Sequence, residues 1–349
     1  MKTLCAHRVE HRYVFGFIGV AAALLLAGGL VVFSAASPQN PPVEQAPTIK
    51  VPVELVNVFF LAKDKHGGLI SDLNRNEVNV QEDGRPQQVS FFEKDTNVPL
   101  TIALMLDTSG SIQEEDIFPL EQEGAIEFLH TVMRQGDLSL VIHFDLDVEL
   151  DQDFTDNFTL LEKAIKSARI NTGGGGYQGP VNLPSPGGTH LYDGIVLACN
   201  DELREEAGRK VMVLVTDGED QGSKYRLNDA VESAQKANTM IYTIFFEPRR
   251  VPRFSMGYPP PMVSGGNTGV LNKLANETGG KSFFPRNLQD MRKAYNEIND
   301  QLHSQYRLGY TPSNTVRDGS YRKINLSCSR SDVKIVARKG YYAPRENNP

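Results

Sequence analysis

The sequence has no surplus of basic residues. Its 349 residues include 36 Lys and Arg against 43 Asp and Glu, which gives a net charge of −7. Nucleic-acid-binding proteins carry a basic patch or stripe, and this chain has no basic stripe. We therefore expect no nucleic-acid partner. Apart from the absence of tryptophan, the composition is that of an ordinary soluble globular protein.

Common catalytic motifs are also missing. The seven histidines form no HExxH pair, and no GxSxG segment occurs. The glycine run at 173–176 lacks the GxxxxGK(S/T) spacing of a phosphate-binding loop and is interpreted as a plain loop. The signatures of zinc proteases, α/β-hydrolases and P-loop enzymes are thereby excluded. We expect a protein that is not an enzyme.

Cysteine is scarce, with three residues in the whole chain. Cys5 lies in the N-terminal segment, whereas Cys199 is expected in a helix and Cys328 in a strand of a different domain. A disulfide between Cys199 and Cys328 is chemically allowed outside the cytoplasm. Because they are predicted in separate domains, two separate thiols are the favoured interpretation.

The N-terminus contains one long apolar run. Tyr13 to Phe33 is an uncharged stretch of 21 residues, preceded by Lys2, Arg8 and Arg12, and the next charge is Glu44. This length suits a membrane-spanning helix, and the charge asymmetry places the N-terminus inside. Ser34-Ala35-Ala36 also resembles a cleavage site, so a removed signal peptide stays possible. We expect an extracytoplasmic protein of the cell envelope, anchored by a single pass or, if cleaved, secreted or periplasmic.

The chain divides into five parts. Residues 1–36 are the anchor or signal peptide, and residues 37–52, with five prolines, are a linker. Alternating strands are expected in 53–96, strands alternating with helices in 97–302, and three further strands in 303–345. Neither β segment is long enough to bury a core alone. We predict a doubly wound, mostly parallel α/β sheet inserted in a small β-sandwich that both flanking segments build.

The stretch LTIALMLDTSGS, residues 100–111, is the centre of this organisation. Its uninterrupted apolar run predicts a strand buried on both faces of a parallel sheet. Asp107, Ser109 and Ser111 follow at the carboxyl end, where open α/β sheets place their ligand sites. One interpretation is an all-oxygen site for a hard cation. The other is a polar turn that caps the next helix.

Two further polar residues fall where the fold would bring them to the same edge. Asp217 follows the apolar strand KVMVLVT, and Thr189 closes a glycine-rich loop before a helix expected over about His190–Arg204. Gly187 and Gly188 would let the Thr189 loop approach closely. Because carboxyl ends of parallel strands share one edge, these residues are expected to meet the DTSGS segment.

The set Asp107, Ser109, Ser111, Thr189 and Asp217 closely resembles the metal-ion-dependent adhesion site (MIDAS) of von Willebrand factor type A domains, with no substitution. The flanking β segments resemble the VWFA-related Acidobacterial domain family, over nearly all of residues 53–344. The resemblance implies direct metal ligation by the three hydroxyls, with the two carboxylates orienting bound waters. It also implies Mg²⁺ or Mn²⁺ as the ion and a protein ligand that presents an acidic side chain.

An acidic stretch offers a second, weaker cation candidate. Asp145, Asp147, Glu149, Asp151 and Asp153 alternate along one segment but lack the order of an EF-hand loop. We interpret them as the solvated face of an edge strand.

The leading hypothesis is a non-enzymatic, exported binding module that engages a protein ligand through a divalent cation. A metal-dependent hydrolase is the first alternative, with His190 as its general base because it is the only His close in sequence to a predicted ligand. An assembly scaffold with an idle metal site is the second.

Overall fold

The computed structural model describes most of the chain after the linker. The described residues are 55–94, 98–110, 117–171, 188–246 and 266–345. Pro52–Pro349 form one compact unit, distinct from Met1–Val51. The predicted membrane segment, the linker and the 173–176 glycine run lie outside the described residues. Among the described helices, none has the length and apolar character needed to cross a bilayer.

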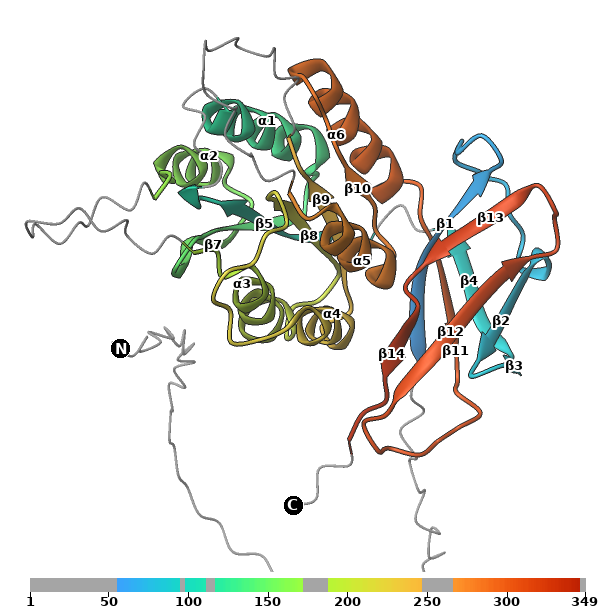
Figure 1. Ribbon diagram of the computed structural model, residues 1–349. Helices are drawn as coiled ribbons and strands as arrows, with labels where there is room; N and C mark the ends of the chain where they lie inside the picture. Colours follow the sequence, from blue (N-terminus) through green and yellow to red (C-terminus); the bar gives the residue numbers. More distant parts are fainter. Residues whose placement is uncertain (1–54, 95–97, 111–116, 172–187, 247–265, 346–349) are drawn as a thin grey trace, which may run out of the picture. The chain divides into compact units, whose positions relative to one another are not determined.

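A six-stranded sheet forms the centre of the α/β part (Figure 1), in the order β10-β9-β8-β5-β6-β7. All neighbouring strands pair in parallel except β6 and β7, which are antiparallel. The strands are β5 Leu100–Asp107, β6 Leu138–Phe144, β7 Val148–Thr155, β8 Arg209–Val215, β9 Thr239–Ile244 and β10 Ser282–Phe283. Every residue of β5 is buried, as its unbroken apolar run predicts, and β7 lies at the sheet edge.

Helices cover both faces of this sheet. The even-numbered residues of β5 from Leu100 to Leu106 share one core with α1, α2 and α6, whereas Ala103 and Met105 share another with α3, α4 and α5. This division follows from the two-residue period of a strand. The helices are α1 Ile117–Val132, α2 Phe158–Ser167, α3 Leu191–Leu197, α4 Leu227–Lys236, α5 Thr268–Thr278 and α6 Leu288–Leu302. The helix expected over 190–204 is present as α3 followed by a π-helical turn, Ala198–Leu203.

Both flanking segments contribute to two antiparallel sheets, ordered β13-β1-β11-β4 and β14-β12-β2-β3. Their strands are β1 Val56–Asp64, β2 Val78–Glu82, β3 Arg85–Gln87, β4 Val89–Lys94, β11 Tyr306–Tyr310, β12 Tyr321–Cys328, β13 Val333–Ala337 and β14 Gly340–Tyr342. The sheets share one apolar core. The predicted fold class is confirmed: a mostly parallel α/β sheet with two small sheets built by the flanking segments.

The tail has four strands, so the prediction of three is wrong. β13 pairs with β1 in one sheet, and β14 pairs with β12 in the other. The chain therefore changes sheets at residues 338–339, which divides what the sequence suggested was one strand.

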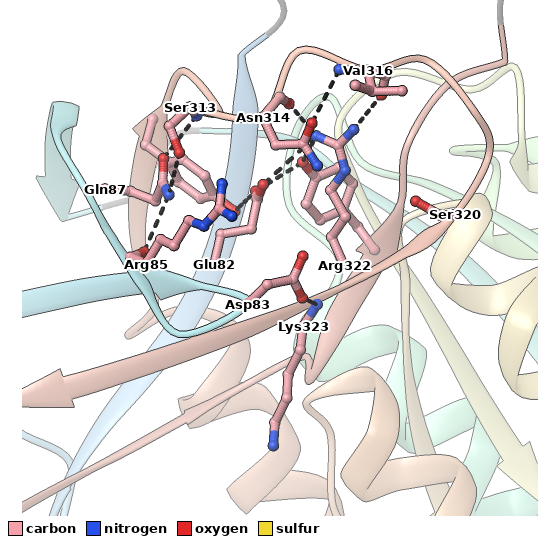
Figure 2. A network of polar contacts seen from close by, with 12 residues as sticks. Glu82, Asp83, Arg85, Gln87, Ser313, Asn314, Val316, Ser320, Arg322 and Lys323 are labelled. Carbon is pink, nitrogen blue, oxygen red and sulfur yellow. Dashed lines mark hydrogen bonds and ion pairs between the residues drawn. The ribbon is translucent and has the colours of Figure 1, made fainter.

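A buried polar network joins the two small sheets (Figure 2). The Tyr310 and Tyr341 hydroxyls donate to Glu82 Oε2 at 2.8 and 2.9 Å, and Arg322 Nη1 lies 3.6 Å from Glu82 Oε1. Glu82 and Arg322 are 2 % and 3 % exposed. The Arg322 guanidinium also donates to the backbone carbonyls of Asn314 and Val316. The network thus links an N-terminal strand to three C-terminal ones.

Candidate metal-ion site

Asp107 is the last residue of β5, between β6 and β8. Its side chain is 1 % exposed, because neighbouring strands pair with β5 on both sides. Ser109, in the loop that follows, is 3 % exposed, and its backbone N–H donates to Asp107 Oδ1 at 2.9 Å. The loop therefore turns back over the carboxylate. Ser111, the third member of the predicted motif, lies outside the described residues.

The loop after β8 supplies Asp217 and a further residue, Thr216, that is not in the predicted set. Thr216 Oγ1 donates to the other Asp107 carboxylate oxygen, Oδ2, at 2.5 Å. Thr216 Oγ1 in turn accepts from the Gly218 N–H at 3.1 Å, where the backbone has a φ of +80°. Asp217 is 8 % exposed and accepts from the Glu219 N–H at 2.9 Å. Thr216 thus ties the loop that carries Asp217 to the end of β5, which carries Asp107.

Thr189 reaches the same loop through backbone pairing. Its N–H donates to the Gln221 carbonyl at 3.2 Å, and the Gln221 N–H donates to the Thr189 carbonyl at 2.8 Å. Thr189 is 4 % exposed. A Cβ on Gly188 would come within 2.6 Å of Leu146 and 2.8 Å of the Gln221 carbonyl. The close approach therefore needs glycine at position 188, as predicted; position 187 is outside the described residues.

The carboxylates interact unfavourably with each other. Burial raises the pKa of Asp107 to about 7, and the negative charge of Asp217 adds to this, while hydrogen bonds from Ser109 and Thr216 oppose it. A divalent cation between such groups reverses the effect, because it stabilises their ionised forms. Buried oxygen ligands of this kind are what Mg²⁺ or Mn²⁺ prefers. The described members of the predicted set therefore fit a hard cation.

A third buried carboxyl group, that of Glu121 in α1, is affected by the charges of the same two aspartates. Its side chain is 4 % exposed, and Oε2 has no hydrogen-bond partner within the described part of the chain. Burial raises its pKa well above the usual range, and the charges of Asp107 and Asp217 raise it further. Sequence patterning could not identify it, because helix α1 is amphipathic with or without this residue.

The acidic stretch differs from the prediction at two residues, Asp145 and Asp151. Glu149 and Asp153 are exposed, as a solvated edge strand requires. Asp151 instead pairs with His143, with Oδ2 and Nδ1 2.7 Å apart. Asp145 is 8 % exposed and precedes the edge strand β7, so its assignment to the solvated face is wrong. It follows β6 directly and turns towards the β5 loop.

The structure also locates His190 and two of the cysteines. His190 occupies the N-cap position of α3, although its side chain makes no capping hydrogen bond. Its Nε2 would lie 2.8 Å from a Cβ on Gly222, so the ring packs against the Asp217 loop. Cys199 and Cys328 are both free thiols, the first buried and the second partly buried. Among the residues described, no three or more His, Cys, Asp or Glu side chains gather as a metal-ion cluster. The predicted set is of another kind, with three hydroxyls and two carboxylates.

Comparison with known proteins gives matches to one family. Two family models of the von Willebrand factor type A domain match residues 102–219 and residues 180–301. Among curated proteins, none matches this sequence.

The solved structures that this chain is similar to share little sequence with it. Proximal thread matrix protein 1 from the mussel byssus, solved with a zinc-occupied MIDAS motif, is 15 % identical, with a TM-score of 0.44; the match covers 62 % of this chain and 48 % of that one. The chain thus spans about half the length of the mussel protein. A von Willebrand factor type A protein from Catenulispora acidiphila is 11 % identical, with coverages of 79 % and 76 % and a TM-score of 0.46. The domain of the type V pili tip protein Mfa5 from Porphyromonas gingivalis is 12 % identical, with coverages of 59 % and 95 % and a TM-score of 0.40.

Proposed function

We propose that this chain, which carries a von Willebrand factor type A domain, is a binding module that takes a protein ligand through a divalent cation. Domains of this type are usually non-catalytic and often bind proteins in a metal-dependent way. The observation that carries the proposal is the pair of buried carboxylates, Asp107 and Asp217, at the carboxyl edge of adjacent strands. Their repulsion costs free energy that a bound cation would offset.

In this proposal Ser109, Ser111 and Thr189 supply hydroxyl oxygens to the ion, and Asp107 and Asp217 orient its waters. Mg²⁺ suits the set because it keeps several waters and accepts few protein oxygens; Mn²⁺ is the alternative ion. A bound divalent ion would supply an electrophilic centre for a carboxylate of another molecule. Asp107, Ser109 and Thr189, all nearly completely buried, are the described residues that would hold the ion.

We also propose that the module works outside the cytoplasm, in the cell envelope. The support is the 21-residue uncharged run from Tyr13 to Phe33, with Lys2, Arg8 and Arg12 on one side. Membrane attachment through this segment and the Pro-rich residues 37–52 would hold the domain away from the bilayer. Cleavage after residue 36 would instead release it.

Calorimetric titration of the purified full-length chain with MnCl₂ and MgCl₂ tests the metal site. The wild type is expected to bind, and its melting temperature to rise, because a ligand at 100 times its Kd stabilises the folded state by about 2.7 kcal/mol. Asp107→Ala should abolish binding, and Thr189→Ala should weaken it. Asp153→Ala, which removes an exposed carboxylate of the edge strand, is the matched control and should change nothing.

Far-UV circular dichroism of each variant establishes that the fold is retained. No heat of binding by the folded wild type at millimolar metal would refute the proposal, as would metal binding by Asp107→Ala at wild-type affinity. A ligand captured from envelope extract in Mg²⁺ and released by EDTA would then identify the partner.

A further inference from the structure

We propose that Asp145 is a positioning residue for the metal site, holding two of its loops in register without binding the ion. The inference deepens the proposed function and rests on it. Asp145 follows the last residue of β6, the strand next to β5. It is 8 % exposed, which is unusual for an ionisable side chain unless other groups satisfy its charge.

The Asp145 carboxylate holds the first loop. Its Oδ2 accepts from Thr108 Oγ1 at 3.0 Å, and Thr108 lies between Asp107 and Ser109, two predicted members of the site. The Thr108 N–H donates to the Phe144 carbonyl at 2.9 Å, one residue before Asp145. Backbone and side chain of Thr108 are therefore both held by the end of β6.

The Asp145 backbone holds the second loop. Its carbonyl accepts from the His190 N–H at 2.7 Å, and His190 directly follows Thr189. The other carboxylate oxygen, Oδ1, accepts from the N–H groups of Leu146 and Asp147, at 2.5 and 3.2 Å, which closes the turn and fixes the side chain. One residue thus contacts the neighbours of two predicted metal ligands.

These contacts complete a ring of hydrogen bonds around the site. Asp145 joins the Thr108 loop to the Thr189 loop, and the Thr189–Gln221 pairing joins the Thr189 loop to the Asp217 loop. Thr216 Oγ1 closes the ring by donating to Asp107. Residues that orient metal ligands in this way change metal affinity by about 10- to 100-fold when they are mutated. If Asp145 no longer holds the two loops in place, metal binding is therefore expected to weaken although the protein stays folded.

The test compares three full-length variants in a Mn²⁺ titration followed by calorimetry and by electron paramagnetic resonance of the bound ion. Asp145→Asn removes the charged acceptor of the Thr108 hydroxyl and leaves the Phe144 carbonyl, at 3.3 Å, as that hydroxyl's remaining acceptor, whereas Thr108→Val removes the hydroxyl itself. Each is expected to lower Mn²⁺ affinity by about 10-fold or more and to broaden the spectrum of the bound ion. Asp147→Asn changes an exposed carboxylate two residues further along the same turn and should leave both readouts unchanged.

The double variant Asp145→Asn/Thr108→Val separates a shared contact from two independent effects. Because both changes break one hydrogen bond, the double variant should lose no more affinity than the weaker-binding single variant. Thr108→Val keeps the shape of the side chain. The test can therefore still be made with this variant if Asp145→Asn does not fold. A purely structural role would lower metal-free stability without changing the affinity or the spectrum of the folded fraction.

Three outcomes overturn the inference. Wild-type affinity in Asp145→Asn and Thr108→Val would refute it while leaving the metal site in place, as would fully additive losses in the double variant. Failure of the folded wild type to bind Mn²⁺ would refute the proposed function and, with it, the role of Asp145.

Discussion

Glu82→Gln is expected to destabilise the two small sheets strongly, although it removes no side-chain volume. Glu82 is 2 % exposed and accepts from two tyrosine hydroxyls while it faces the Arg322 guanidinium. The amide carries no charge and has one acceptor oxygen where the carboxylate has two. Arg322 would then be a buried cation without a counter-charge. Both tyrosine hydroxyls donate to the same oxygen, Oε2, so an amide oxygen that keeps these two bonds places its NH₂ group towards the guanidinium.

The expected loss in the free energy of unfolding depends on how deeply the Glu82–Arg322 pair is buried, not on the distance between its atoms. Breaking a buried ion pair by removing one partner costs about 3–5 kcal/mol. The Arg322 guanidinium keeps its bonds to the Asn314 and Val316 carbonyls, so we expect a value at the lower end, about 3 kcal/mol. With a urea m-value of about 2 kcal/mol/M, the unfolding midpoint would fall by about 1.5 M.

Glu93→Gln is the matched control. The Glu93–Arg307 pair is shorter, with Oε2 and Nη2 2.7 Å apart against 3.6 Å for Glu82–Arg322, but the Glu93 side chain is 56 % exposed. An exposed pair contributes about 0–1 kcal/mol. Loss of the closer Glu93–Arg307 pair should therefore lower the free energy of unfolding less than loss of the Glu82–Arg322 pair.

Urea unfolding of the two variants and the wild type can be followed by far-UV circular dichroism and by tyrosine fluorescence, since the chain has 12 Tyr and no Trp. The reasoning is refuted if Glu82→Gln lowers the midpoint by no more than Glu93→Gln does. A larger loss in Glu93→Gln than in Glu82→Gln would show that distance, not burial, sets the energy of both pairs.

Two further predictions concern pH and topology. A hydrogen bond from His143 to the Asp151 carboxylate raises the pKa of His143 above 6.5. The stabilising contribution of this pair is therefore complete below pH 6.5 and is lost as pH rises through the higher folded-state pKa. Urea midpoints of the wild type should fall over that interval more than those of His143→Gln, and identical slopes would contradict this. Protease added to intact spheroplasts that express the full-length chain should degrade the domain after residue 52. Its protection would disprove export, whereas a mature N-terminus near Ser37 would show cleavage.

Much of the α/β fold could be predicted because burial is encoded locally. An unbroken apolar run such as Leu100–Leu106 has no polar face to expose, so it can only form a strand covered on both sides. The helix expected from about His190 is present from Leu191, as α3. Each flanking segment is too short to bury an apolar core alone, and this is why the two could be predicted to fold together.

The candidate site was predictable only where a polar residue directly follows an apolar strand. Asp107 and Asp217 satisfy this condition, and the glycine at 188 indicated a close approach of Thr189. Asp145 also follows an apolar strand, but the alternating acids after it suggested a solvated face. Thr216 was missed because its partner, the Asp107 carboxylate, is more than a hundred residues away in the chain.

Amino-acid order alone determined which segments of this protein are buried, and hence its strands, most of its helices and the two carboxylates at the sheet edge. The tertiary structure decided which polar groups meet. Strand order places β5 between β6 and β8, so Asp107 faces Thr216 while Thr108 faces Asp145. Local patterns of hydrophobicity cannot encode such pairs, because a hydrogen bond between distant residues depends on where the whole sheet brings their strands together.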